Sequence, residues 1–202
     1  MGSNLVRVLL RENFEITVID SLIFGGESLL DVWPHPNFTF VKGDITKKDV
    51  IEQLLSKHEF DAVVHLAAIV GDPACSREPD LARKTNWEAS CSLLNASIKN
   101  NVKRFIFAST CSNYGKMSDQ DGYLDENSTL APVSLYAELK VKFEKLMLEE
   151  MEKTPAFCPT SLRFATVYGI SPRMRFDLTV NEFTKELACG KELLVYGEHR
   201  RR

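Results

Sequence analysis

The strongest constraint on the fold is an alternation between short segments rich in β-branched and aromatic residues and longer amphipathic segments. Such alternation is typical of parallel βαβ units, because a crossover helix must join each strand to the next. The expected strands span residues 15–20, 38–41, 62–66, 104–108 and 161–165. The expected helices span residues 5–12, 48–57, 80–101, 134–151 and 178–188. The sequence therefore predicts an α/β protein with a doubly wound parallel sheet, whose ligands bind at the carboxyl ends of the strands.

The two ends of the chain predict an incomplete sheet. A helical pattern stands at the start, where a sheet of this type normally has a strand, and strand-like residues stand at the other end. We therefore expect a chain cut at both ends that lacks its first strand. Segments 15–20, 62–66 and 104–108 should lie parallel in one sheet, with a gap or unpaired strand edges where the first strand would lie. Turns are expected at Gly25-Gly26, at residues 34–36 and at Asp72-Pro73.

Composition excludes several classes of protein. The 25 Lys and Arg against 28 Asp and Glu give a net charge of −3, which argues against a nucleic-acid partner. No apolar run approaches the roughly 20 residues of a membrane-spanning helix, and we expect neither a signal peptide nor a lipid anchor. The five cysteines form no CxxC pair, which favours reduced thiols in a cytoplasmic protein. The four histidines lack metal-ligand spacing, so no metal site is expected.

Acidic and small residues follow three of the expected strands. Asp20 closes the strand 15–20, where a carboxylate can hold the adenosine ribose of NAD and repel the extra phosphate of NADP. Asp44 could accept a hydrogen bond from an adenine amino group. Either residue could instead form a turn or cap a helix. Small residues in the sequence HLAA, residues 65–68, would let a cofactor approach closely, or they simply fill the core.

Tyr136 and Lys140 form the sharpest pair, because a spacing of four residues places both on one helical face. Ser134 is a plausible N-cap of their helix. A lysine ammonium beside the phenol would lower its pKa from about 10, so that tyrosinate could act as a base near neutral pH. Thr110 could hydrogen-bond the same substrate oxygen. Such a set could remove a hydroxyl proton while a nicotinamide accepts a hydride.

Eight motifs occur in a recognisable order along the chain: GSNLVRVLL, VID, KGDI, VVHLAA, TNW, STCSNYG, YAELK and LRFATVYG. With them the chain resembles the extended short-chain dehydrogenase/reductase family, specifically its NAD-dependent nucleotide-sugar epimerases and dehydratases, over essentially its whole length. The resemblance implies a Rossmann-like NAD-binding domain in residues 1–168. It also implies that residues 169–202 begin a substrate-binding region.

Site residues follow from the same resemblance. The implied catalytic residues are Thr110, Tyr136 and Lys140. The implied NAD-binding residues are Gly2, Asp20, Ser21, Asp44, Ile45, Leu66, Ala67, Ala68, Asn86, Tyr136 and Lys140. The implied substrate-binding residues are Thr110, Thr166 and Arg202.

Three departures from the family pattern bear on function. The glycine-rich turn GxxGxxG and its strand are missing, and only Gly2 can match the last glycine. Cys111 and Ser112 follow Thr110, where 4,6-dehydratases carry an Asp-Glu pair. Thr166 stands where epimerases usually carry an asparagine in the RxxN segment. The missing Asp-Glu pair argues against a 4,6-dehydratase, and the leading expectation from the resemblance is NAD-dependent 4-epimerisation of a nucleotide sugar.

Several alternatives stay open. A nucleotide-sugar dehydratase or dehydrogenase would use the same catalytic residues. A non-catalytic nucleotide-binding protein or an inactive fragment would use none of them. A homodimer is also among the expectations.

Overall fold

Two parallel sheets make up the strand layer of the structure, a computed structural model that describes residues 1–116 and 123–193. One sheet pairs β1 (Ile16–Asp20) with β2 (Phe38–Lys42). The other has the order β3-β4-β5, formed by β3 (Ala62–His65), β4 (Arg104–Thr110) and β5 (Cys158–Phe164). All five predicted strands are present and all their pairings are parallel.

The predicted helices are also present. They are α1 (Gly2–Arg11), α2 (Lys48–Lys57), α4 (Pro79–Arg83), η2 (Lys84–Ala89), α5 (Ser90–Lys99), α6 (Leu135–Lys153) and α7 (Thr179–Ala188). The helix expected at 80–101 is divided into α4, the π-helical segment η2 and α5. The sequence did not predict α3 (Asp72–Arg77) or the 3₁₀ helices η1 (Glu27–Leu29) and η3 (Cys111–Tyr114). The break expected at Asp72-Pro73 does separate β3 from the next helix, but the two residues begin α3, because the missing N–H of Pro73 is harmless in a first helical turn.

The expectation of one continuous sheet is wrong, whereas the expected gap is confirmed. β1 pairs with β2, and β3 pairs with β4, but β1 and β3 belong to different sheets. Within residues 1–116 and 123–193 no strand lies between them. The side chain of Val64 on β3 is accordingly 37% exposed, which is unusual for a strand in the interior of a parallel sheet.

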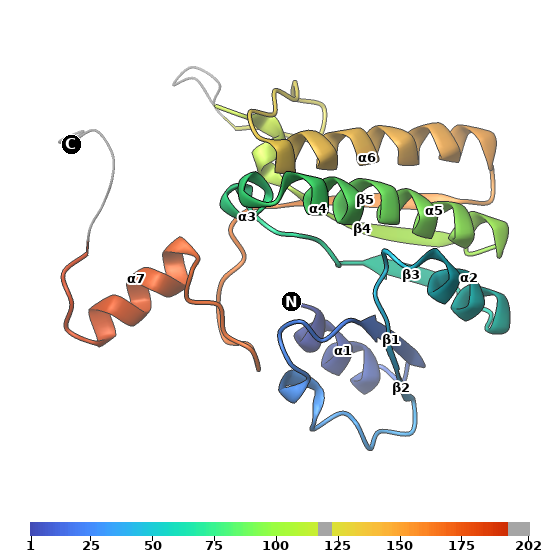
Figure 1. Cartoon of the computed structure of the whole chain (residues 1–202), viewed down its shortest axis with the longest axis horizontal. Coiled ribbons are helices and arrows are strands. Elements are labelled where there is room, and N and C mark those ends of the chain that lie inside the picture. The colour runs from blue at the N-terminus through green and yellow to red at the C-terminus, as the bar shows by residue number, and fades with distance from the viewer. Residues whose placement is uncertain (117–122, 194–202) are drawn as a thin grey trace.

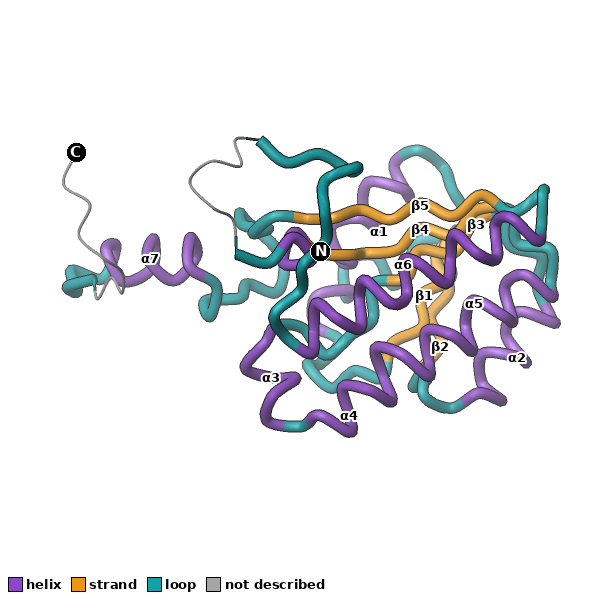
Figure 2. Tube along the Cα trace, turned by 90° about the horizontal axis from the view of Figure 1, so that it is seen from above, coloured by secondary structure: helices purple, strands orange, loops and turns teal. Residues whose placement is uncertain are grey.

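Helices α2, α5 and α6 cover one face of the three-stranded sheet (Figure 1). Their apolar residues Ile51, Leu94 and Phe143 pack with Phe105 and Phe107 of β4 in the main core. Viewed from above, α6 runs along β4 and β5 (Figure 2). This packing fixes the start of α6 near the carboxyl end of β4.

A smaller core joins α1 to the two-stranded sheet. Val6 and Leu10, one helical turn apart, pack with Phe38 of β2. Helix α7 contributes no buried residue and lies apart from the sheets (Figure 1). The proposed domain division after residue 168 falls between β5 and α7 and stays a prediction.

Candidate active site

The strand β4 and the helix α6 bring the predicted catalytic residues to one end of the three-stranded sheet. Thr110 is the last residue of β4 and is 8% exposed, and its Oγ1 accepts a hydrogen bond from the Ser112 N–H at 3.2 Å. Ser134 is the N-cap of α6, as predicted, and its Oγ accepts from the Ala137 N–H at 3.3 Å. The Ser134 hydroxyl also donates to Asp72 Oδ1 at 2.6 Å. Local capping thus fixes where α6 begins.

Tyr136 and Lys140 are both buried, and Tyr136 packs with Cys75 of α3 and Ala82 of α4. The Lys140 Nζ donates to the Ala108 carbonyl oxygen at 2.7 Å and lies 5.6 Å from the centre of the Tyr136 ring. The predicted sharing of one helical face is therefore confirmed. Because Ala108 lies two residues before Thr110, the same contact places Lys140 beside the end of β4.

The predicted lowering of the tyrosine pKa is wrong for this arrangement. Burial raises the pKa of Tyr136 to about 12, and the charge of Arg175 opposes that rise. Burial also lowers the pKa of Lys140 to about 8, although Cys75 and Glu144 act in the opposite direction. The sequence pattern could not reveal that both groups are desolvated, nor that the ammonium is bonded to a main-chain carbonyl.

At the other sheet, the two predicted carboxylates stand at neighbouring strand ends. Asp20 closes β1 and is exposed, and its Oδ1 accepts from the Leu22 N–H at 2.7 Å. Asp44 follows β2 and is also exposed, and its Oδ1 accepts from the Thr46 N–H at 2.8 Å. Each carboxylate thus supports a local turn. Ser21 is half-buried, whereas Ile45 is buried in the main core.

The predicted small-residue segment lies against the start of α1. A Cβ atom placed on Gly2 would meet Leu66 Cδ1 at 3.5 Å, so this helix end and the end of β3 are neighbours. Ala67 is exposed and Ala68 is half-buried. The first turn of α1 carries no acidic side chain, so its N–H groups face no competing carboxylate of the same turn.

Asn86 has a clear structural partner that the sequence did not reveal. Its Oδ1 accepts from the Ile69 N–H at 2.8 Å, and its Nδ2 donates to the Ile69 carbonyl at 2.9 Å. The residue is buried within η2. Both of its polar groups therefore hold the segment that follows β3.

The remaining predicted site residues are less informative. Thr166 is exposed in the segment after β5, and Arg202 lies outside the described residues. Sequence reasoning missed Arg175, whose guanidinium donates to Asp177 Oδ1 at 3.0 Å and to Oδ2 at 2.7 Å. Its main chain is held by Asn181, whose Nδ2 donates to the Arg175 carbonyl at 2.9 Å. The charged RFD sequence was the available signal for this group.

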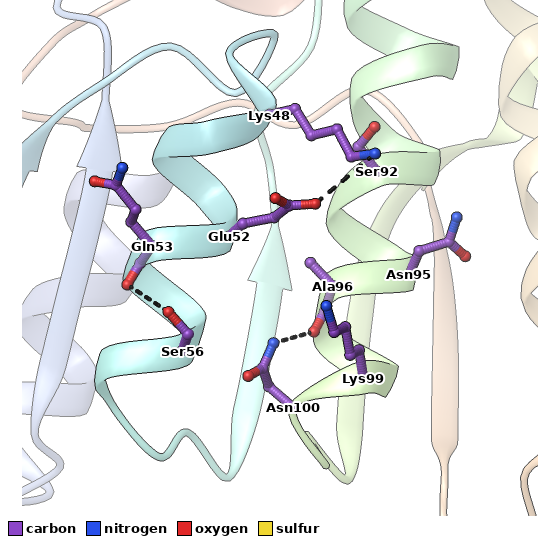
Figure 3. Close-up of a pocket in the computed structure, with 9 residues that line it drawn as sticks. All are labelled: Lys48, Glu52, Gln53, Ser56, Ser92, Asn95, Ala96, Lys99 and Asn100. Atoms are coloured by element: carbon purple, nitrogen blue, oxygen red, sulfur yellow. Dashed lines mark hydrogen bonds and ion pairs between the residues drawn. The ribbon is translucent and has the colours of Figure 1, made fainter.

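One surface cleft lies away from these residues. It has a volume of about 380 Å³ and lies between α2 and α5 (Figure 3). Its lining is polar and includes an ion pair between Lys48 Nζ and Glu52 Oε1 at 3.8 Å. None of the predicted site residues lines it.

Other site types find little support in the described residues. The structure records all five cysteines as free thiols. No group of three or more His, Cys, Asp or Glu within residues 1–116 and 123–193 could hold a metal ion. In the same residues, the helices are too short or too polar to cross a lipid bilayer.

The parallel α/β architecture is that of the class of doubly wound, Rossmann-like proteins. The sequence model of the NAD dependent epimerase/dehydratase family matches residues 1–202, and the chain belongs to that family.

Comparison with individual proteins agrees with this assignment. The chain is 31% identical over 171 residues to a UDP-glucose 4-epimerase of Lactobacillus helveticus, covering 85% of this chain and 50% of that protein. It is 31% identical to a dTDP-glucose 4,6-dehydratase of Streptomyces niveus, covering 100% of this chain and 61% of that protein. A UDP-glucose 4-epimerase of Thermotoga maritima, solved with UDP-glucose, superposes with a TM-score of 0.85 at 30% identity, covering 98% of this chain and 62% of that one. The chain thus spans about half to three fifths of these relatives.

Proposed function

We propose that the protein catalyses NAD-dependent epimerisation at C4 of a nucleotide sugar. The observation that carries this proposal is the burial of Tyr136 and Lys140 together beside β4, the strand that Thr110 closes. Buried titratable groups with shifted pKa values at the carboxyl end of a parallel sheet are typical of active sites. Membership of the family and the similarity to 4-epimerases support the same reaction class.

In this proposal, residues at the ends of β1, β2 and β3 and on α6 would hold the two ends of NAD. The exposed carboxylates of Asp20 and Asp44 would hold the adenosine half, and Leu66 with the two following alanines would line the middle. Lys140 would hold the ribose near the nicotinamide. The N–H groups of the first turn of α1 suit a phosphate, because that turn has no acidic side chain. When bound, NAD supplies a hydride acceptor that can later return the hydride.

Residues of the chain would then accept the proton of the substrate hydroxyl. The phenolic oxygen of Tyr136 accepts the proton of the C4 hydroxyl, and Thr110 hydrogen-bonds the same substrate oxygen. A pKa of about 12 makes tyrosinate costly at neutral pH, by about 7 kcal/mol for five pH units. This pKa of about 12 already includes the favourable charge of Arg175. Lys140, whose Nζ lies 5.6 Å from the centre of the Tyr136 ring, is the cation that would offset the cost in the reaction. A pKa of about 8 keeps most of Lys140 charged at pH 7.

A 4,6-dehydratase is the second candidate. Its support is the similarity to the dTDP-glucose 4,6-dehydratase of Streptomyces niveus. Cys111 and Ser112 follow Thr110, and neither offers the carboxylic acid that elimination of water would use. This difference favours epimerisation.

The test compares substrates in the purified full-length gene product. Bound NAD is quantified first, and UDP-glucose, UDP-galactose and dTDP-glucose are then assayed by separation of the sugar nucleotides. We expect interconversion of the UDP-sugars without loss of water from dTDP-glucose.

A pair of tyrosine variants identifies the base. Tyr136→Phe should lower turnover by roughly 10² to 10⁴, the usual effect of losing a general base. Tyr123→Phe is the control, because Tyr123 is fully exposed. An unchanged rate in Tyr136→Phe would remove Tyr136 from the mechanism. Loss of water from dTDP-glucose alone would replace the epimerase proposal with the dehydratase.

A further inference from the structure

A buried carboxylate lies one helical turn beyond Lys140. Glu144 is 5% exposed, and its Oε1 accepts a hydrogen bond from the Ser109 hydroxyl and another from Asn113 Nδ2 at 2.9 Å. Arg163 donates to Glu144 Oε2 from Nη2 at 2.8 Å and from Nε at 3.1 Å. One carboxylate on α6 thus receives donors from β4, η3 and β5.

These contacts join the helix that carries Tyr136 to the strand that carries Thr110. Lys140 donates to the carbonyl of Ala108, and Ser109, the next residue of β4, donates to Glu144. Two consecutive residues of the strand therefore hold two consecutive turns of the helix. A slide of α6 by one residue, about 1.5 Å, would break both contacts.

The ion pair between Glu144 and Arg163 costs free energy, because the carboxylate must be desolvated. A buried ion pair is often no more stabilising than apolar side chains of similar size, whereas removing one partner leaves an uncompensated charge. Arg163 makes further contacts, because its Nη1 donates to the Tyr114 hydroxyl at 3.0 Å and to the Glu126 carbonyl at 3.1 Å. Such directional contacts specify a register, which apolar packing does less strictly.

We propose that Glu144, paired with Arg163, is a positioning residue that fixes the register of α6 on β4 and so the geometry of Thr110, Tyr136 and Lys140. The inference rests on the proposed function, in which Tyr136 accepts the substrate proton. It also gives a role to Arg163, which stands three residues before Thr166 in the segment where epimerases usually carry RxxN.

Glu144 has a second, electrostatic effect on the site. Its charge opposes the lowering of the Lys140 pKa by burial. The other titratable groups that act on or face Lys140 are Cys75 of α3, Tyr136 of α6 and His65 of β3. Removing the carboxylate charge should therefore let Lys140 lose its proton at a lower pH.

The variants separate positioning from stability. Glu144→Gln keeps the size of the side chain and an acceptor oxygen but removes the charge. Because this leaves the half-buried Arg163 without its charge partner, the double variant Glu144→Gln/Arg163→Gln restores the charge balance. Glu149→Gln is the control, since Glu149 is exposed on the same helix. All are made in the full-length gene product.

Kinetics in the epimerase assay give the first readout. We expect the double variant to regain most of the urea midpoint lost by Glu144→Gln, while its kcat stays at least tenfold below the parent and its KM changes less than threefold. The upper limb of the kcat–pH profile should move to lower pH in Glu144→Gln, because the carboxylate charge no longer favours protonated Lys140. A double variant with the parent kcat would overturn the proposal.

Hydrogen exchange gives a readout that needs no turnover. Peptides covering residues 104–110 and 135–144 should exchange faster in the double variant, and at the parent rate in Glu149→Gln. Unchanged exchange in both peptides would overturn the proposal even if the kinetics had changed. A parent protein that converts no sugar nucleotide would instead contradict the proposed function. In that case hydrogen exchange alone would test whether Glu144 and Arg163 fix the register of α6 on β4.

Discussion

Acid sensitivity of folding should depend on His65, a buried histidine at the end of β3. Its side chain is 3% exposed, its ring centre lies 5.7 Å from that of Phe107, and its Nε2 lies 2.8 Å from Ser90 Oγ. Burial, with a smaller contribution from the charge of Lys140, lowers the pKa of His65 from 6.5 to about 3. The folded protein therefore keeps this imidazole neutral at pH values where the unfolded chain takes up a proton.

The magnitude follows from proton linkage. Above pH 6.5 the histidine is neutral in both states and has no effect, and between pH 6.5 and about 3 only the unfolded state gains the proton. Stability therefore falls as the pH falls through this window, by about 1.4 kcal/mol for each pH unit. At pH 5 the loss due to His65 is about 2 kcal/mol, a large share of the 5–15 kcal/mol typical of a domain.

Urea unfolding followed by tryptophan fluorescence at pH 7 and pH 5 measures this loss. His65→Gln does not titrate and can still hydrogen-bond Ser90, so its stability should fall by about 2 kcal/mol less than that of the parent. His58→Gln removes an exposed histidine and should behave like the parent. Equal losses in the parent and in His65→Gln would refute the assignment, because carboxylates common to both proteins would then explain the acid sensitivity.

Two further substitutions test the cofactor site and the turn that follows β4. Asp20→Asn keeps the oxygen that accepts from the Leu22 N–H but loses the charge. The affinity for NAD should therefore fall about tenfold to a hundredfold, and the preference for NAD over NADP should shrink. Calorimetric titration of both dinucleotides measures the ratio of their affinities, and an unchanged ratio would contradict this prediction. Gly115→Ala should lower the free energy of unfolding by more than about 2 kcal/mol, because φ is 72° and the new Cβ would clash with the Ala131 carbonyl oxygen. A urea midpoint equal to that of the parent would show that the turn can relax.

Hydrophobic periodicity predicted the elements well wherever burial alone decides them. The bounds of α2 match residues 48–57, because Ile51 and Leu55 recur at the helical period on a buried face. The start of β5 was predicted three residues late, and the observed strand includes Pro159. Pro159 is tolerated because β5 has only one neighbour, β4, so the missing N–H can face the free edge.

The sequence pattern could not predict where a helix is interrupted or which groups the polar side chains would contact. The π-helical segment η2 adds no change of composition to a stretch whose periodicity predicts one helix, and it holds Asn86, which bonds the main chain of Ile69. Their spacing predicted that Tyr136 and Lys140 share a helical face. The directions in which their pKa values shift depend on burial, which the spacing does not reveal. Glu144 could have been found, because it continues the same buried face at the next turn, where a carboxylate is unexpected.

The contact between α6 and the sheet separates into two chemically different halves. Toward the amino end of β4, Phe105, Phe157 and Met147 are nearly or fully buried and form an apolar cluster. Toward its carboxyl end the same contact holds Lys140, Glu144 and the Ser109 hydroxyl, all at most 5% exposed. Desolvating these polar groups lowers the stability of the fold, whereas apolar side chains in the same positions would carry no such cost. Because the apolar half shows that this helix and sheet can pack without polar groups, the polar half is best explained by the chemistry proposed for the end of β4.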